Sequence, residues 1–346
     1  MWIFKSFKQD FLRIYLSAIL AFLFLKYAQT KGDDALPMML LSILVFNFSD
    51  VGHVYTTIIK TWMDPGERKY SKQYWLTPLT ILIIIVGWRY IFNFNYFWAC
   101  VVYFDLWHNL KQGYGVMKWY ESLNQQYYKL SKLFYYGLTL IPFAIFNVRV
   151  TNFSFFNYYT SEQRPFELIN EHYDFLFLNH NFTFDNKYHF FAVAFYILFL
   201  NIWLVWELNN YLTNNKLEKI RLLAMVYYGS IYGYCFIFSQ HFMEVLILLI
   251  SSHGVPYLCM LYKRMDALQT VKKHYGKIIF GLLIFGGSMD YFYNTILNEN
   301  ERVLKNPNPI ELILIILYLL PVLTHFVWDG YLWKKDHPDS IKVYKK

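Results

Sequence analysis

The chain has 346 residues, of which 56% are hydrophobic, 22% are aromatic and only 16% are charged. Soluble domains carry charge on about a quarter of their residues, so this composition argues against a soluble protein. It predicts a single integral membrane domain over residues 1–346. The net charge of +8 is spread over many short segments without one basic patch, which argues against nucleic-acid binding. The three cysteines lie in apolar runs without metal-type spacing, so neither a disulfide framework nor a zinc motif is expected.

Apolar runs recur along the whole chain, and most reach the ~20 residues that a helix needs to span a bilayer. They predict helices over residues 11–28, 37–61, 74–94, 96–118, 131–150, 188–208, 219–239, 241–262, 276–296 and 310–333. The first run follows basic residues, as in a signal peptide, but it lacks a small-x-small cleavage site and is expected to be retained. The expected fold is all-α, a polytopic transmembrane helical bundle of about ten helices.

The long connection over residues 151–187 is rich in Asn and Phe. Within it, Phe and Leu alternate with acids over Phe166–Leu178, a pattern that suits a short helix lying at the membrane interface. With ten helices and the N-terminus inside, this connection is expected to lie outside.

The basic residues are unevenly distributed between the two expected sides of the membrane. Alternating sides from a cytoplasmic N-terminus places 24 of the 32 Lys and Arg residues inside and 8 outside. Such an excess is what the positive-inside rule describes. It predicts that both termini are cytoplasmic and that the protein is a multi-pass component of the inner (plasma) membrane.

Four histidines lie on predicted helices that all run from the outer to the inner side. After His53, His108, His253 and His325, a basic residue marks the cytoplasmic end at +7, +10, +10 and +9. At 1.5 Å per residue, the four imidazoles lie roughly 10–15 Å from the inner boundary. Side chains at one depth can converge in one layer, and ionisable residues inside a membrane usually face the protein interior. The pattern predicts a metal site with these four histidines as ligands.

Three of the histidines share a helix face with an aspartate. The pairs are Asp50 with His53, Asp105 with His108, and His325 with Asp329. At i,i+3 or i,i+4 spacing, the acid can be a second ligand or can orient a ligating imidazole. Lys111 and Gln112, one turn after His108 at the expected cytoplasmic mouth, complete the candidate catalytic set with the three aspartates.

Irregular residues gather at the same level. Gly254 and Pro256 follow His253, and Pro321 precedes His325, so both helices are expected to kink near their histidine. Broken helices in membranes line buried cavities. A proton or ion pathway uses the same residue types, and so does structural polar packing, so these alternatives stay open. Asp290 is expected to make only a helix-packing contact.

Three stretches form a recognisable set. They are Asp50-x-x-His53 followed by Thr57 and Asp64-Pro65-Gly66-Glu67, then Trp107-His108-x-x-Lys111-Gln112-x-Tyr114-Gly115, and His325-x-x-x-Asp329-Gly330-x-x-Trp333-Lys334. The set resembles a family of bacterial multi-pass membrane proteins. More distantly, the layout is similar to that of the Brp/Blh-type carotene-cleaving oxygenases, which are polytopic and thought to hold iron with membrane histidines. The resemblance implies iron chemistry on a carotenoid-like substrate.

Together these features predict a membrane-embedded, metal-dependent oxidoreductase or oxygenase. Iron is the expected cofactor, with another first-row metal as the alternative, because imidazole and carboxylate suit such metals. The expected partners are membrane lipids and a hydrophobic small-molecule substrate: a lipid, an isoprenoid or a carotenoid. The alternative function is a proton- or ion-coupled membrane transporter, in which the same histidines and aspartates titrate rather than bind metal.

Overall fold

The structure, a computed structural model, is helical, and no strand occurs among the residues that it describes. It describes residues 2–4, 6–30, 52–91, 94–123, 130–149, 186–214, 219–239, 242–264 and 307–333, with single positions between 41 and 50 and short stretches between 273 and 288. The helical elements are α1 (Phe7–Asp10), η1 (Phe11–Tyr15), α2 (Leu16–Gln29), α4 (Gly52–Met63), η3 (Pro65–Tyr70), α5 (Ser71–Ile91), α6 (Phe94–Leu123), α7 (Ser131–Arg149), α10 (Asn186–Asn214), α11 (Lys219–Gly233), η5 (Tyr234–Phe238), α12 (Phe242–Arg264) and α16 (Pro309–Leu332). The prediction of an all-α fold is confirmed for this part of the chain.

Several helices extend beyond their predicted bounds. α6 continues to Leu123 rather than ending at residue 118, and α10 covers Asn186–Asn214 rather than 188–208. An apolar run marks only the stretch that suits the bilayer, whereas backbone hydrogen bonding can continue into polar sequence. The predicted interfacial helix Phe166–Leu178 lies outside the described residues, as do Asp290 and most of the helix expected over 276–296.

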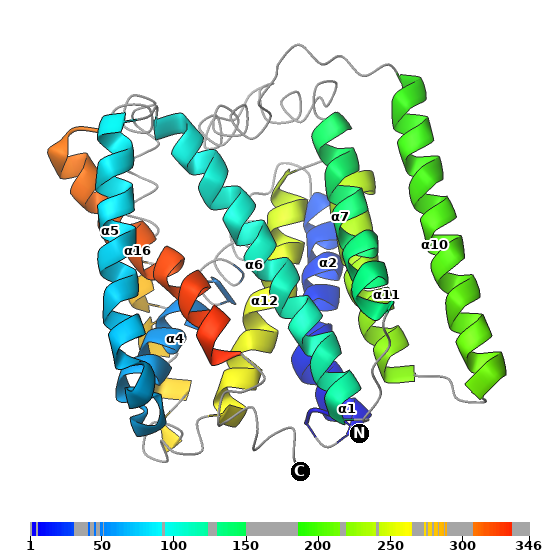
Figure 1. Cartoon of the computed structure of the whole chain (residues 1–346), viewed down its shortest axis with the longest axis horizontal. Coiled ribbons are helices and arrows are strands. Elements are labelled where there is room, and N and C mark those ends of the chain that lie inside the picture. The colour runs from blue at the N-terminus through cyan, green and yellow to red at the C-terminus, as the bar shows by residue number, and fades with distance from the viewer. Residues whose placement is uncertain are drawn as a thin grey trace.

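Figure 1 shows the long helices arranged side by side, with α5 near one edge and α10 at the other. α10 packs against α7, which in turn packs against α11, and α16 packs against α5. α4, α6, α12 and α16 occupy the region between these groups (Figure 1). The middle of the molecule therefore holds the four helices that carry the histidines.

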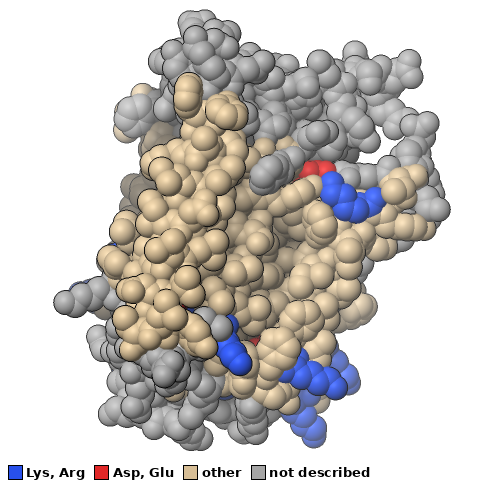
Figure 2. Space-filling model, turned by 90° about the vertical axis from the view of Figure 1, so that its right-hand side faces the viewer, with Lys and Arg blue, Asp and Glu red and all other residues tan. Residues whose placement is uncertain are grey.

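Among the residues that the structure describes, six helical stretches are long and apolar enough to cross a membrane. They are Phe7–Ala28, Glu67–Ile91, Phe190–Thr213, Lys219–Ile237, Glu244–Lys263 and Pro309–Leu332. Large apolar side chains on α5 and α10 are exposed, among them Ile83, Leu198 and Val205. Figure 2 shows a face whose broad middle is almost free of charged residues, which lie toward its lower edge and at its upper right. Continuous exposed apolar surface of this kind indicates a membrane protein.

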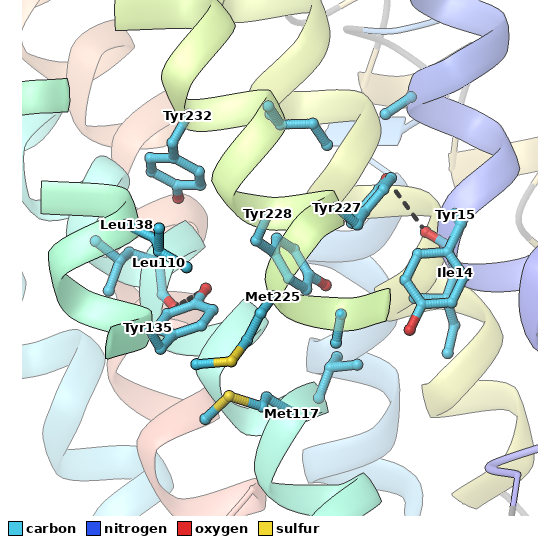
Figure 3. Close-up of a cluster of buried hydrophobic side chains, with 14 of the residues drawn as sticks. Ile14, Tyr15, Leu110, Met117, Tyr135, Leu138, Met225, Tyr227, Tyr228 and Tyr232 are labelled. Carbon is cyan, nitrogen blue, oxygen red and sulfur yellow. Dashed lines mark hydrogen bonds between the residues drawn. The ribbon is translucent and has the colours of Figure 1, made fainter. Parts of the chain in front are cut away.

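An aromatic core joins the first helix to the helices on the α10 side. Tyr135, Tyr227, Tyr228 and Tyr232 lie among methionine and leucine side chains in Figure 3. Tyr135 donates its hydroxyl hydrogen to the Leu110 carbonyl oxygen at 3.0 Å, so α7 is attached to the helix that carries His108. Buried tyrosines need such partners for their hydroxyl groups, and these bonds fix the position of α6 from one side.

A buried ion pair joins α10 to α11. The Arg221 guanidinium donates two hydrogen bonds to Glu207, at 2.7 and 2.6 Å, and the Trp203 indole donates a third at 3.1 Å. Arg221 also lies 4.7 Å from the Trp206 ring. Bidentate geometry in a low-dielectric region makes such a pair strong once formed. Glu207 is therefore a structural acid, distant in role from the histidines.

α16 begins at a well-formed cap. The Asn308 side chain accepts hydrogen bonds from the backbone of Ile310 and Glu311, while the Glu311 side chain accepts from the Asn308 backbone. Pro309 occupies the first helical position, where its missing N–H costs nothing. This capping box fixes where α16 starts and hence the register that brings His325 to the centre.

Candidate metal centre

The four helices that carry the histidines form a closed ring of neighbours. α4 contacts α12 and α16, and α6 contacts the same two helices. Each helix contributes one histidine: His53, His108, His253 and His325 from α4, α6, α12 and α16. A ring of helices with one inward-facing imidazole each is the arrangement that helical bundles use for metal sites.

The imidazole rings follow the same cyclic order as the helices. The His53 ring centroid lies 4.6 Å from that of His253 and 4.6 Å from that of His325. The His108 ring centroid lies 4.8 Å from that of His253 and 4.9 Å from that of His325. All four side chains are buried. The expected convergence of these histidines is therefore present.

The nitrogen atoms come close enough to share one ion. One ring nitrogen from each histidine can be chosen so that all four lie within 4.8 Å of one another. Four nitrogens bound tetrahedrally at ~2.0–2.1 Å would lie about 3.3 Å apart, so each nitrogen of the widest pair would have to move inward by about 0.7 Å. The nearest pair, Nε2 of His53 and Nε2 of His253, is 3.1 Å apart. An ion at the centre would need only a small contraction of the cluster.

Several of these nitrogens have no hydrogen-bond partner in the described part of the chain. They are Nε2 of His108, Nδ1 of His253 and Nε2 of His325. A buried polar atom without a partner is costly, and native proteins have few of them. The orphan Nε2 atoms of His108 and His325 are accounted for if their lone pairs are kept for a cation. His253 faces His53 with its Nε2, so the same ion does not account for its partnerless Nδ1.

The segment before α4 orients His53. Its Nδ1 lies 2.9 Å from the Ser49 carbonyl oxygen, which can only accept, so Nδ1 carries the proton and donates. The Nε2 lone pair is then directed at His253. Ser49 in turn donates from its hydroxyl to the Ile250 carbonyl oxygen at 3.1 Å, which ties this segment to α12. A ligating histidine commonly has its other nitrogen held in this way.

A polar chain orients His325. Its Nδ1 lies 2.9 Å from the Thr57 hydroxyl oxygen, and that hydroxyl also contacts the hydroxyl of Tyr257. Tyr257 donates to Asp329 Oδ1 at 2.6 Å. The chain leaves Nε2 of His325 without a partner and directs it at the cluster. Thr57 therefore holds Nδ1 of His325 as the Ser49 carbonyl oxygen holds Nδ1 of His53.

Asp329 lies at the boundary between the cluster and a cavity. Its Oδ2 is 3.5 Å from Nε2 of His108, and its Oδ1 is 3.6 Å from Nδ1 of His325. Both Asp329 and His108 line a cavity of about 610 Å³. Asp329 is thus placed to compensate the charge of a cation or to exchange a proton with a molecule in the cavity.

The other two predicted acids are placed differently. Asp50 Oδ1 lies 3.8 Å from Nδ1 of His53, the nitrogen that faces away from the cluster, so Asp50 can tune His53 but is not a ligand. The Asp105 carboxylate accepts a hydrogen bond from Asn109 at 3.2 Å. Within the described residues Asp105 makes no ion pair with His108, so the expected contact is not formed. Helical spacing brings two side chains to one face, but a competing neighbour can take the bond.

Gln112 and Lys111, the two candidates that follow His108, make different contacts. Gln112 donates its side-chain N–H to the His253 carbonyl oxygen at 2.8 Å, which joins α6 to α12 beside the cluster. Lys111 is exposed and lies over the Trp107 ring at 5.1 Å. Both residues line the cavity. Gln112 positions helices, whereas Lys111 presents a charge to the cavity.

Tyr257 was not among the residues predicted for the site. It is fully buried and lies 5.4 Å from the His53 ring and 5.2 Å from the His325 ring, between centroids. It stands four residues after His253, a spacing that shares a helix face. This spacing from His253 could have indicated Tyr257, but the chain has 32 tyrosines, and nothing else in the sequence distinguishes this one.

Kinks were expected at Gly254, Pro256 and Pro321. Pro256 and Pro321 each lie inside an uninterrupted helix, α12 and α16. A Cβ built on Gly254 would lie 2.6 Å from the Ser49 carbonyl carbon. Gly254 therefore allows α12 to approach the segment that orients His53.

Comparisons with protein family models, with characterised proteins and with solved structures give no match for this chain. The site itself combines four buried imidazoles with a carboxylate at the edge of a cavity.

Proposed function

We propose that the protein is a membrane-embedded metalloenzyme that binds iron through His53, His108, His253 and His325. The observation that carries the proposal is the convergence of four buried imidazole nitrogens within 4.8 Å, one from each of four helices. Imidazole ligands suit iron and its first-row neighbours, and no cysteine belongs to the cluster. Iron held there would supply O2 chemistry, so the enzyme is proposed to be an oxidoreductase or oxygenase.

The geometry favours a metal centre over a titratable pathway. In a pathway, ionisable groups are placed in sequence so that a proton or ion can pass from one to the next. Here the four rings surround one point, and the hydrogen bonds of His53 and His325 leave lone pairs directed at that point. This arrangement supports a bound cation more than a relay, so transport is the weaker candidate.

The substrate is proposed to be an apolar molecule that reaches the site from the bilayer. The cavity beside His108 has walls of Phe104, Trp107 and Phe326, and the first two of these side chains are exposed. Aromatic walls exclude water and accommodate hydrocarbon. A lipid, an isoprenoid or a carotenoid fits this setting, with Asp329 and Lys111 as the polar groups nearest the reacting part.

The membrane placement is part of the same proposal. We place the chain in the inner (plasma) membrane as a ten-helix bundle with both ends cytoplasmic, supported by the bias of basic residues to one side. Single cysteines introduced into 64–70, 121–128, 214–218 and 266–272 should be labelled from the cytoplasm, and those in 151–187 from outside. Labelling of residues 124 and 169 from the same side would overturn this topology.

Metal analysis of purified protein tests the centre directly. The wild-type protein, purified without chelator, should carry about one equivalent of iron, measured by elemental analysis. Alanine at any of the four cluster positions should lower occupancy strongly, because three imidazoles leave the ion incompletely held. His274→Ala is the matched control, because His274 is an exposed histidine outside the cluster.

The outcomes separate the alternatives. Occupancy by zinc or copper instead of iron would keep the centre but remove O2 activation by iron. A folded protein that takes up no first-row metal, even when expressed in supplemented medium, would refute the metal centre. Proton-coupled uptake in proteoliposomes, abolished by the same four substitutions, would then support a transporter.

A further inference from the structure

The cavity beside His108 is elongated along α6. Its wall includes residues from successive turns of α6, at positions 104, 107, 108, 111, 112, 114, 115, 116, 118, 119 and 122. From His108 to Ser122 this part of the wall runs for about 21 Å at 1.5 Å per residue. The opposite wall comes mainly from α16, which crosses near α6 in Figure 1. The cavity can therefore hold an extended chain with one part beside the metal centre.

The cavity wall combines apolar rings with two lysines, and the carboxylate of Asp329 lies in the wall beside the histidines. Trp119 and Trp333 contribute to the apolar part, and Lys111 and Lys118 are the two cations in the wall. Lys118 is paired with Glu121 at 2.6 Å. Lys111 has a ring contact with Trp107 but no acidic partner among the described residues. Its charge is therefore available to a ligand.

We propose that the cavity binds an amphiphile with an anionic head, whose carboxylate or phosphate pairs with Lys111 while its hydrocarbon chain lies along the aromatic wall of α6. An uncharged hydrocarbon would make no use of the charge of this exposed lysine. A cationic amphiphile would be repelled by it. The inference names the substrate class of the proposed enzyme and rests on that function for the reaction, but binding itself does not require the metal.

The open space at Gly115 provides an independent way to test the cavity. A Cβ built there meets no atom within 4 Å. Gly115 lies in the cavity wall between the two lysines. Gly115→Leu should therefore leave α6 intact, since leucine favours helix more than glycine does, and its side chain should project into the cavity and block it.

Binding is measured with cis-parinaric acid, a fluorescent fatty acid that receives energy from tryptophans such as those in the cavity wall. Purified protein in a non-ionic detergent should bind the acid more tightly than its methyl ester. Lys111→Met should weaken binding of the acid by about two- to fivefold, the usual value of an ion pair at an exposed side chain. The same change should leave the ester unaffected, and Lys111→Arg should retain tight binding.

Controls and competitors complete the design. Lys132→Met removes an exposed lysine of α7 that does not line the cavity and should change nothing. Dodecanoate and dodecyl phosphate should displace the probe, and whichever is stronger identifies the head group. Dodecanol and dodecyltrimethylammonium should displace it poorly. Gly115→Leu should abolish binding while its thermal unfolding matches that of the wild type.

Failure of this inference is distinguishable from failure of the proposed function. Equal binding of acid and ester, or unchanged binding in Lys111→Met, would overturn the anionic amphiphile even in protein that carries iron. Charge-dependent binding in wild-type protein that carries no metal would uphold it and refute the metalloenzyme.

Discussion

Gly254 offers the sharpest test of how the metal centre is assembled. Substitution by alanine adds one methyl group where α12 faces Ser49. That carbon would lie 2.6 Å from the Ser49 carbonyl carbon, and closer still to the carbonyl oxygen, whereas ordinary contact begins at 3.4 Å. The Ser49 backbone must therefore move by about 0.8 Å or more, because backbone atoms cannot rotate out of the way as a side chain can.

The displacement should reach the proposed metal site through His53. The same carbonyl oxygen accepts the hydrogen bond from Nδ1 of His53, and the Ser49 hydroxyl bonds to Ile250 on α12. Overpacking of this kind costs roughly 1–3 kcal/mol of stability, and loss of a group that orients a ligand lowers metal affinity by about 10–100-fold. Gly254→Ala should therefore unfold at a lower temperature and bind iron more weakly.

The assay is paired thermal unfolding and metal competition in the same detergent. Gly87→Ala is the matched control, since Gly87 lies inside α5 and a Cβ there meets no atom within 4 Å. That control should unfold at or slightly above the wild-type temperature, because alanine is the better helix former. Wild-type stability and wild-type metal affinity in Gly254→Ala would refute the close approach and the role given to Ser49.

Two further predictions concern buried polar groups. Tyr257→Phe removes the hydroxyl that donates to Asp329, so metal affinity, measured with a competing chelator, should fall by about tenfold. Tyr227→Phe, which loses a hydroxyl bonded to the Ile14 carbonyl oxygen, should bind metal normally, and equal affinity in both variants would show that the Tyr257 hydroxyl is not needed. Glu207→Ala leaves Arg221 buried without its bidentate partner, so the free energy of unfolding should fall by about 3–5 kcal/mol. Glu207→Met combined with Arg221→Met should recover most of this loss, and a double variant less stable than Glu207→Ala would contradict that account.

The all-α fold and the four clustered histidines could be predicted from the sequence for physical reasons. An apolar composition forces the backbone to satisfy its hydrogen bonds within each segment, and helices do this in a membrane. Depth along a helix is a linear property, at a fixed rise per residue. Counting from His53, His108, His253 and His325 to the nearest basic residue therefore located four imidazoles at one level, and the structure brings them together.

The predicted roles of the aspartates show where such counting ends. Asp105 and Asp329 both share a helix face with a histidine, yet Asp105 bonds to Asn109 whereas Asp329 lies between two imidazoles and accepts from Tyr257. The spacing of two residues along a helix predicts only which face of the helix both side chains share. Which neighbour occupies that face depends on the helix packed opposite, and one sequence does not contain that information locally.

The sequence by itself determined the class of fold, the membrane setting and the four histidines, because composition, apolar periodicity and rise per residue are properties of single segments. The tertiary structure decided the cyclic order α4, α12, α6, α16, the Ser49 and Thr57 contacts that orient the rings, and the cavity along α6. These depend on which helix faces meet across more than two hundred residues of chain, as in the contact of His325 with Thr57. Packing between distant segments is set by the whole molecule, so no local pattern predicts it.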